Sequence, residues 1–122
     1  MISVRDTLLI PDDRGNEHLF VVIAKDEKRE AVLLVNFTSS RIGGDHTCVV
    51  GANEHPFLKY DSTINYADAR ITPIRNIEYN LEKKTFKKHF PVSKGLLKKI
   101  QDGALNSHSI PIKCSRFLAE NA

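Results

Sequence analysis

The sequence contains few cysteines, no tryptophan and no long hydrophobic run. Two cysteines in 122 residues are too few for the disulfide framework of a small secreted scaffold. The longest apolar stretches, 19–24 and 31–35, are far shorter than the roughly 20 residues that a membrane helix needs. The chain does not open with a charged and apolar signal segment. These absences exclude a disulfide scaffold and a helical membrane protein, and they lead us to expect a cytoplasmic protein.

A glycine-rich phosphate-binding loop is also lacking, which disfavours nucleotide-dependent chemistry of the Walker or Rossmann type. The length is typical of one compact domain. We therefore expect a single domain over residues 1–122. Its barrel core would cover residues 1–75, and a basic hairpin and helical extension would cover residues 76–122.

The net charge of +3 is small, but the charges are unevenly distributed. Residues 1–69 hold seven basic and eleven acidic side chains (7 − 11 = −4), whereas residues 70–100 hold nine basic and two acidic ones (9 − 2 = +7). Clustered basic side chains raise the local potential whatever the net charge. The second segment is therefore either a contact for a polyanion or a solvated basic face.

Short apolar segments separated by turn residues predict an antiparallel β-sheet. The expected strands cover residues 6–11, 19–24, 31–37, 47–50 and 62–71. The last of these does not alternate cleanly between apolar and polar side chains, which indicates a bulge or a functional face.

Helix signals are concentrated in the C-terminal part of the chain. Ser93 is a suitable N-cap, apolar residues follow at helical spacing, and Gly103 suits the end of that helix. A second short helix is expected from residue 111 or 113 to 120, and residues 78–87 fit either a polar hairpin or a helical turn. The predicted fold class is α+β and mainly β, a small antiparallel barrel with C-terminal helices.

Four segments occur in an order that is typical of one protein family. They are DTLLI at 6–10, HLFVVIA at 18–24, VLLVNFTS at 32–39 and DSTINYADARI at 61–71. In these patterns the chain resembles the PemK/MazF toxins over roughly residues 4–75. The resemblance implies an SH3-like barrel, usually a homodimer, that cleaves single-stranded RNA without a metal. It also implies a toxin–antitoxin system with a protein antitoxin.

The resemblance assigns roles to four positions. Thr38 and Ser39 match the family's Thr-Ser pair, which helps to hold the scissile phosphate. Ser62 matches the serine that opens the following strand, and Arg70 matches the arginine that closes it. A Thr-Ser pair after a strand is also common turn chemistry.

Two segments depart from the family pattern. Ala67-Asp68 stands where the family typically has Asp-Gln, and a shift by one residue in a strand moves a side chain to the other face. Glu17-His18-Leu19 stands where the family favours Gly-x-Arg-Pro. A catalytically inactive barrel that binds nucleic acid or a protein partner is therefore the alternative to an endoribonuclease.

Cleavage of RNA through its 2′-hydroxyl requires a base, an acid and a donor to the charged phosphate. His18 can act as acid or base because imidazole titrates near neutral pH. Asp68 or Asp61 can act as base or orient His18, and Arg70 can bind the phosphate, although Asp68 and Arg70 can also simply pair. The expected catalytic residues are His18, Thr38, Ser39, Asp68 and Arg70.

The loop at 55–61 carries aromatic residues, and single-stranded RNA is bound through aromatic faces as well as through charge. Phe57 is more easily explained as core, whereas Tyr60 is left open between stacking and packing. The expected nucleic-acid-binding residues are Arg41, Lys59, Tyr60, Ser62 and Arg75.

A zinc site is a weaker hypothesis. His46, Cys48 and His55 are ligands of suitable type, but their spacing matches no standard zinc motif. The candidate fourth ligands are Asp45, Asp61 and Cys114. Cys48 lies beside valines, where a buried, unreactive thiol is expected. We therefore expect neither a metal nor another cofactor.

Overall fold

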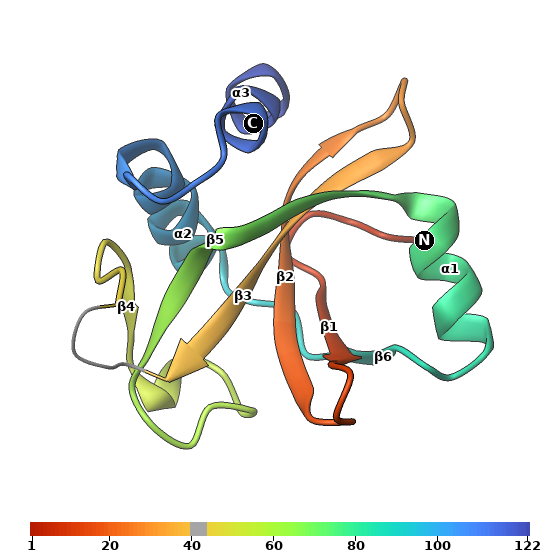
Figure 1. Ribbon diagram of the computed structural model, residues 1–122, viewed down its shortest axis with the longest axis horizontal. Coiled ribbons are helices and arrows are strands. Elements are labelled where there is room, and N and C mark those ends of the chain that lie inside the picture. The colour runs from red at the N-terminus through yellow and green to blue at the C-terminus, as the bar shows by residue number, and fades with distance from the viewer. Residues whose placement is uncertain (40–43) are drawn as a thin grey trace.

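The computed structural model describes residues 1–39 and 44–122. In this part of the chain, six strands form one antiparallel sheet with the order β4-β5-β3-β2-β1-β6. The strands are β1 (Thr7–Pro11), β2 (Glu17–Asp26), β3 (Ala31–Ser39), β4 (Val49–Val50), β5 (Ser62–Pro73) and β6 (Lys87–His89). The sheet curls into a half-barrel (Figure 1). The predicted small α+β barrel with C-terminal helices is confirmed.

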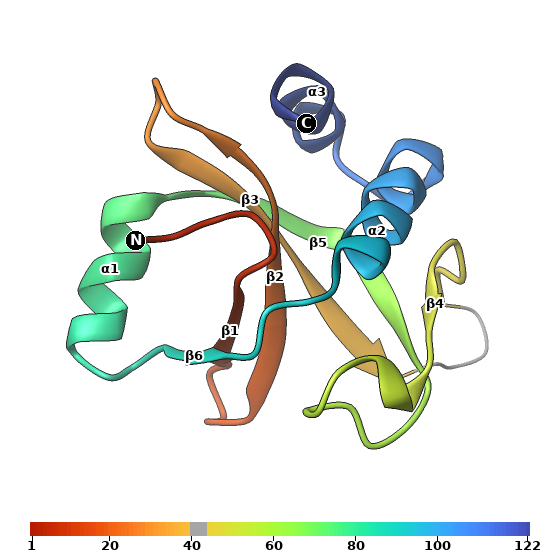
Figure 2. The ribbon, with the colours of Figure 1, turned by 180° about the vertical axis from the view of Figure 1, so that it is seen from behind.

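The helices flank the sheet on two sides (Figures 1 and 2). They are α1 (Ile74–Glu82), α2 (Lys94–Asn106), α3 (Ile112–Asn121) and the short 3-10 helix η1 (Ala52–Glu54). Residues 78–87, left open between helix and hairpin, contain the end of α1 and the start of β6. None of the helices in the described part of the chain has the length and apolar character needed to cross a bilayer.

The start of α2 is as predicted, but its end is not. The Ser93 side chain accepts a hydrogen bond from the backbone N–H of Leu96 at 3.0 Å, as an N-cap does. Gly103, predicted as the end of the helix, lies inside it, and α2 continues to Asn106. A Cβ at Gly103 would overlap the hydroxyl of Tyr66. The glycine therefore allows close packing of helix on sheet and does not end the helix.

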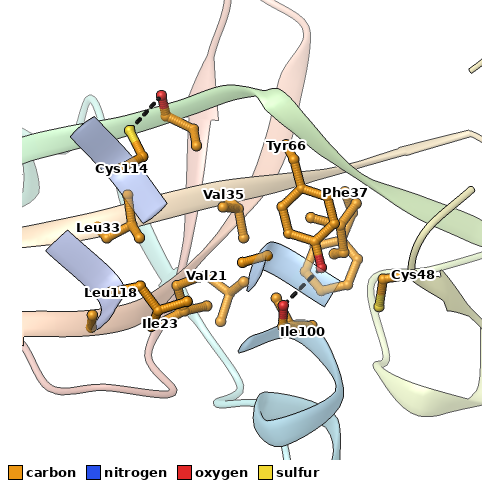
Figure 3. Packing of buried hydrophobic residues seen from close by; sticks show 14 of the residues in the cluster. Val21, Ile23, Leu33, Val35, Phe37, Cys48, Tyr66, Ile100, Cys114 and Leu118 are labelled. Atoms are coloured by element: carbon orange, nitrogen blue, oxygen red, sulfur yellow. Dashed lines mark hydrogen bonds between the residues drawn. The ribbon is translucent and has the colours of Figure 1, made fainter. Parts of the chain in front are cut away.

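Both faces of the sheet are buried, which explains the nearly continuous apolar runs of β2 and β3. One face packs against α2 and α3 (Figure 3), where the buried hydroxyl of Tyr66 donates to the carbonyl of Ile100 at 2.7 Å. The other face packs against α1 through a second cluster that includes Phe20, Leu34 and Ile77. A polar side chain at a buried position of β2 or β3 is therefore exceptional.

A bulge interrupts β5 where the sequence predicted a bulge or a functional face. Leu34 pairs with Arg70 and Asn36 with Asn65, so two steps along β3 correspond to five steps along β5. Within the bulge, Tyr66 and Ala69 are buried in the core beneath α2 and α3, whereas Asp68 and Arg70 are exposed. The bulge thus exposes the charged side chains of Asp68 and Arg70, while the neighbouring Tyr66 and Ala69 anchor this segment in the core.

Candidate functional site

Two cavities that share His18 contain most of the predicted site residues. We call the first the Arg70 pocket; it measures about 320 Å³ and is lined by Ile10, Pro11, Asp12, Asp13, His18, Phe20, Asn36, Asp68 and Arg70. We call the second the Tyr60 groove; it measures about 650 Å³ and is lined by Glu17, His18, Leu19, Phe37, Thr38, Ser39, Pro56, Phe57, Leu58, Lys59, Tyr60, Ser62 and His89. The turn between β1 and β2, the end of β3 and the loop before β5 lie at one end of the molecule (Figure 1). Segments far apart in sequence therefore meet at His18.

His18 is oriented by Asp12, a residue of the turn between β1 and β2. One carboxylate oxygen of Asp12 accepts hydrogen bonds from the backbone N–H groups of Arg14 and Asn16, at 2.9 and 3.0 Å. The other oxygen lies 2.9 Å from Nε2 of His18. The hydrogen bond with His18, together with those from Asn16 and Arg14, lowers the pKa of Asp12. An ionised Asp12 accepts a hydrogen bond from the N–H at Nε2, which leaves Nδ1 of the ring for a ligand.

Asp12 takes the place that the sequence analysis gave to Asp68 or Asp61. Asp68 accepts a hydrogen bond from Nδ2 of Asn65 at 2.9 Å, and Asp61 accepts one from the backbone N–H of Ala52 at 3.2 Å. The sequence analysis did not select Asp12. Its role toward His18 could not be found by sequence, because it depends on how the turn folds back toward the first residues of β2.

Arg70 is held over an aromatic ring. Its guanidinium carbon lies 4.7 Å from the ring centroid of Phe20, a buried residue of β2. Such a cation–π contact fixes the group while leaving its N–H donors available. Asp68 and Arg70 thus have separate partners, Asn65 and Phe20, in place of the simple pairing that their spacing allowed.

Asn36 is a site residue that the sequence analysis missed. It pairs with Phe20 on β2 and with Asn65 on β5, and it is only 6% exposed. Its Oδ1 atom is buried and has no hydrogen-bond partner, although the residue lines the Arg70 pocket. Leaving a buried polar atom unpaired costs about 1–3 kcal/mol. The available signal was a single amide inside the otherwise apolar run 31–37.

The Tyr60 groove combines hydroxyl groups with aromatic rings. Thr38 and Ser39, at the end of β3, lie on it together with Lys59. Tyr60 is 75% exposed, so its ring is free to contact a ligand, which favours stacking over packing. The buried Ser62 donates to the carbonyl oxygen of Tyr60 at 3.2 Å and thereby also holds the loop.

Two of the predicted RNA-binding residues are not in these cavities. Arg75, at the start of α1, lines a separate cleft near the N-terminus. Arg41 lies outside the described residues.

The structure does not assemble the hypothetical zinc ligands. His55 is buried with both ring nitrogens engaged: Nδ1 accepts the N–H of Phe57 at 3.0 Å and Nε2 donates to the carbonyl of Phe90 at 2.6 Å. Burial lowers the pKa of His55 and raises that of the Cys48 thiol. Nδ1 of His46 lies 2.8 Å from the carbonyl oxygen of Gly44. Among the described residues, no three His, Cys, Asp or Glu side chains are grouped to hold a metal ion.

Acidic residues elsewhere in the chain pair with part of the basic segment, residues 70–100. Four of its nine basic side chains form ion pairs: Lys87 with Glu17, Lys88 with Asp6, Lys98 with Asp102 and Lys99 with Glu54. Three of these acids, Asp6, Glu17 and Glu54, belong to residues 1–69, the part of the chain with excess acidic residues. For these four lysines the structure favours the solvated basic face over a dedicated contact with a polyanion.

Comparison with known proteins adds no family assignment. No protein-family model matches the chain, and no curated protein is significantly similar to it in sequence. The two cavities and the residue pattern are therefore the basis for a proposed function.

Proposed function

We propose that the protein is a PemK/MazF-like endoribonuclease that cleaves single-stranded RNA without a metal, in the cytoplasm, as the toxin of a toxin–antitoxin system. One observation carries the proposal. An imidazole oriented by an ionised carboxylate lies where a pocket containing Arg70 meets a groove containing Thr38, Ser39 and an exposed tyrosine. The resemblance adds a homodimer and a protein antitoxin to this proposal.

The groups fit cleavage through the 2′-hydroxyl. The 2′-oxygen attacks phosphorus, the bond from phosphorus to the 5′-oxygen breaks, and the products carry a 2′,3′-cyclic phosphate and a 5′-hydroxyl. The 2′-hydroxyl proton goes to a base, and the leaving 5′-oxygen receives a proton from an acid. His18 supplies one of these two transfers through Nδ1, and Asp68 supplies the other. Arg70 and the hydroxyls of Thr38 and Ser39 stabilise the charge on the phosphate.

The groove offers a path for the rest of the strand. A base stacked on the exposed ring of Tyr60 contributes about 1–3 kcal/mol to binding. Lys59 is its neighbour and supplies a positive charge for the backbone phosphates.

A second candidate function has an observation of its own. Three carboxylates, Asp12, Asp13 and Asp68, line the Arg70 pocket, whereas Arg70 is its permanent cation. Such a pocket also suits a basic side chain of a protein partner. An inactive barrel that binds a partner in this way is the alternative.

The test is the rate at which purified protein cleaves a mixed RNA pool in EDTA. The wild type should cleave, and His18→Ala should lower the rate by about 100-fold or more, the usual contribution of a general acid or base. Arg70→Ala and Thr38→Ala should also lose most of the activity.

Lys59→Ala and Arg75→Ala form a matched pair, because each removes one cation, but only Lys59 lies on the groove. Lys59→Ala should weaken RNA binding and Arg75→Ala should not. Binding of RNA or protein without cleavage supports the second candidate. Cleavage only after addition of zinc contradicts the metal-independent mechanism.

A further inference from the structure

The lining of the Arg70 pocket is rich in hydrogen-bond acceptors. Three carboxylates line it, of which Asp12 and Asp68 already accept hydrogen bonds within the protein, and the buried Oδ1 of Asn36 has no partner in the protein. Buried acceptors are normally paired, and those that are not require an explanation. A ligand that brings N–H groups into the pocket would satisfy this atom. The interior of the pocket therefore suits a donor-rich group.

The framework around Asn36 holds the amide in a fixed place. Its strand is central in the sheet, between β2 and β5, and its cross-strand neighbours are Phe20 and Asn65. The Asn65 amide is already committed to Asp68. Ile10 and Phe20 belong both to the second hydrophobic cluster and to the pocket lining, so the pocket also has apolar walls. Apolar walls with a few fixed polar groups are typical of small-ligand sites.

Among the parts of an RNA strand, a nucleobase fits such a pocket. Guanine carries an N1–H and a 2-amino group on one edge, and thus three N–H hydrogens. Adenine and cytosine carry one amino group each, and uracil a single N–H. Of the four bases, guanine therefore brings the most N–H donors to an acceptor-rich pocket.

We infer that the Arg70 pocket binds a guanine base next to the cleaved phosphate and that Asn36 recognises this base through Oδ1. This inference rests on the proposed RNA cleavage. The pocket and the groove share His18, so the recognised base belongs to a nucleotide on one side of the scissile bond. In this arrangement the exposed Arg70 contacts the phosphate while the base occupies the pocket. Asn36 is thus a specificity residue.

Mapping of the ends that the wild-type protein produces from a random RNA pool tests this directly. Guanine should be enriched at one position adjacent to the cleaved bond. Short RNAs with guanine or adenine at that position should differ in kcat/KM by about tenfold or more, the discrimination expected from a well-placed pair of contacts. This comparison needs no variant.

Asn36→Leu then assigns the preference to the amide. It should reduce the guanine-to-adenine ratio to about one while leaving the melting temperature unchanged or higher, because it removes an unpaired buried polar group. Thr72→Val is the matched control, since Thr72 is a buried polar residue of the same sheet that does not line the pocket. It should retain the wild-type ratio.

Each contrary outcome overturns a definite part of this inference. Cleavage without guanine preference overturns the base pocket and leaves the endoribonuclease standing. A wild-type ratio in the folded Asn36→Leu variant shows that Asn36 is not the recognition residue. A wild-type protein that cleaves no RNA overturns the proposed function and this inference together.

Discussion

Asp45 should make the stability of the protein depend on pH in the acid range. Its Oδ1 accepts the backbone N–H of Thr47 at 2.9 Å and the Thr47 hydroxyl at 2.5 Å, and its Oδ2 accepts the Ser107 hydroxyl at 2.7 Å. Burial opposes ionisation of the carboxyl. The hydrogen bonds from Thr47, Ser107 and Ser109 outweigh burial and lower the pKa of Asp45 from 3.8 to about 2. Because Ser107 is the C-cap of α2, the carboxylate ties the segment before β4 to the end of that helix.

The sign of the effect follows from the direction of the shift. A carboxyl with a lowered pKa in the folded protein stabilises the fold above its ordinary pKa, and the contribution is lost as pH falls through the folded-state value. The change from 3.8 to about 2 corresponds to about 2 kcal/mol, at about 1.4 kcal/mol per pKa unit. Partial solvent exposure reduces the expected contribution to about 1 kcal/mol. The contribution should disappear between about pH 4 and pH 2.

Urea denaturation of the wild type and Asp45→Asn at several pH values measures this contribution. Near neutral pH, the variant should be less stable by about 1 kcal/mol, and most of this difference should be lost by about pH 2, where the Asp45 carboxyl of the folded protein is about half protonated. A difference that stays constant from neutral pH to pH 2 would refute the assignment, because it would show that the charge of Asp45 is not involved. No difference at neutral pH would refute it as well.

Three further variants test the packing and the site. Tyr66→Phe removes the hydrogen bond to Ile100 and should lower the free energy of unfolding by about 1 kcal/mol; an unchanged urea midpoint would contradict this. Gly103→Ala should destabilise by about 1–3 kcal/mol because the new Cβ overlaps the Tyr66 hydroxyl, whereas helix propensity alone predicts stabilisation. Asp12→Asn should lower kcat for RNA by about tenfold or more, because a neutral amide no longer fixes the His18 tautomer; wild-type kcat would exclude that role.

The fold was predictable because its signals are local. Short apolar runs between turn residues define the strands, and Ser93 marks the start of α2 correctly. Gly103 was misassigned because a glycine that ends a helix and a glycine that allows close packing look the same in sequence. The difference lies in Tyr66, 37 positions earlier in the chain, which only the folded structure brings beside it.

The candidate site was predictable only in part. His18, Asp68 and Arg70 were selected through family resemblance and chemistry, and the structure brings them to one pocket. Asp12 and Asn36 were missed because their roles arise from tertiary neighbours. The residues around Asp12 are ordinary for a turn, and only the structure shows its contact with His18. The importance of Asn36 is visible only once its side-chain oxygen is found buried without a hydrogen-bond partner.

The chemical nature of the RNA ends tests the central claim most directly. RNA incubated with the wild-type protein in EDTA and analysed by mass spectrometry should carry 2′,3′-cyclic phosphate and 5′-hydroxyl ends, and these should be absent with His18→Ala. RNA that stays intact, or ends with a 3′-hydroxyl and a 5′-phosphate, would contradict the account.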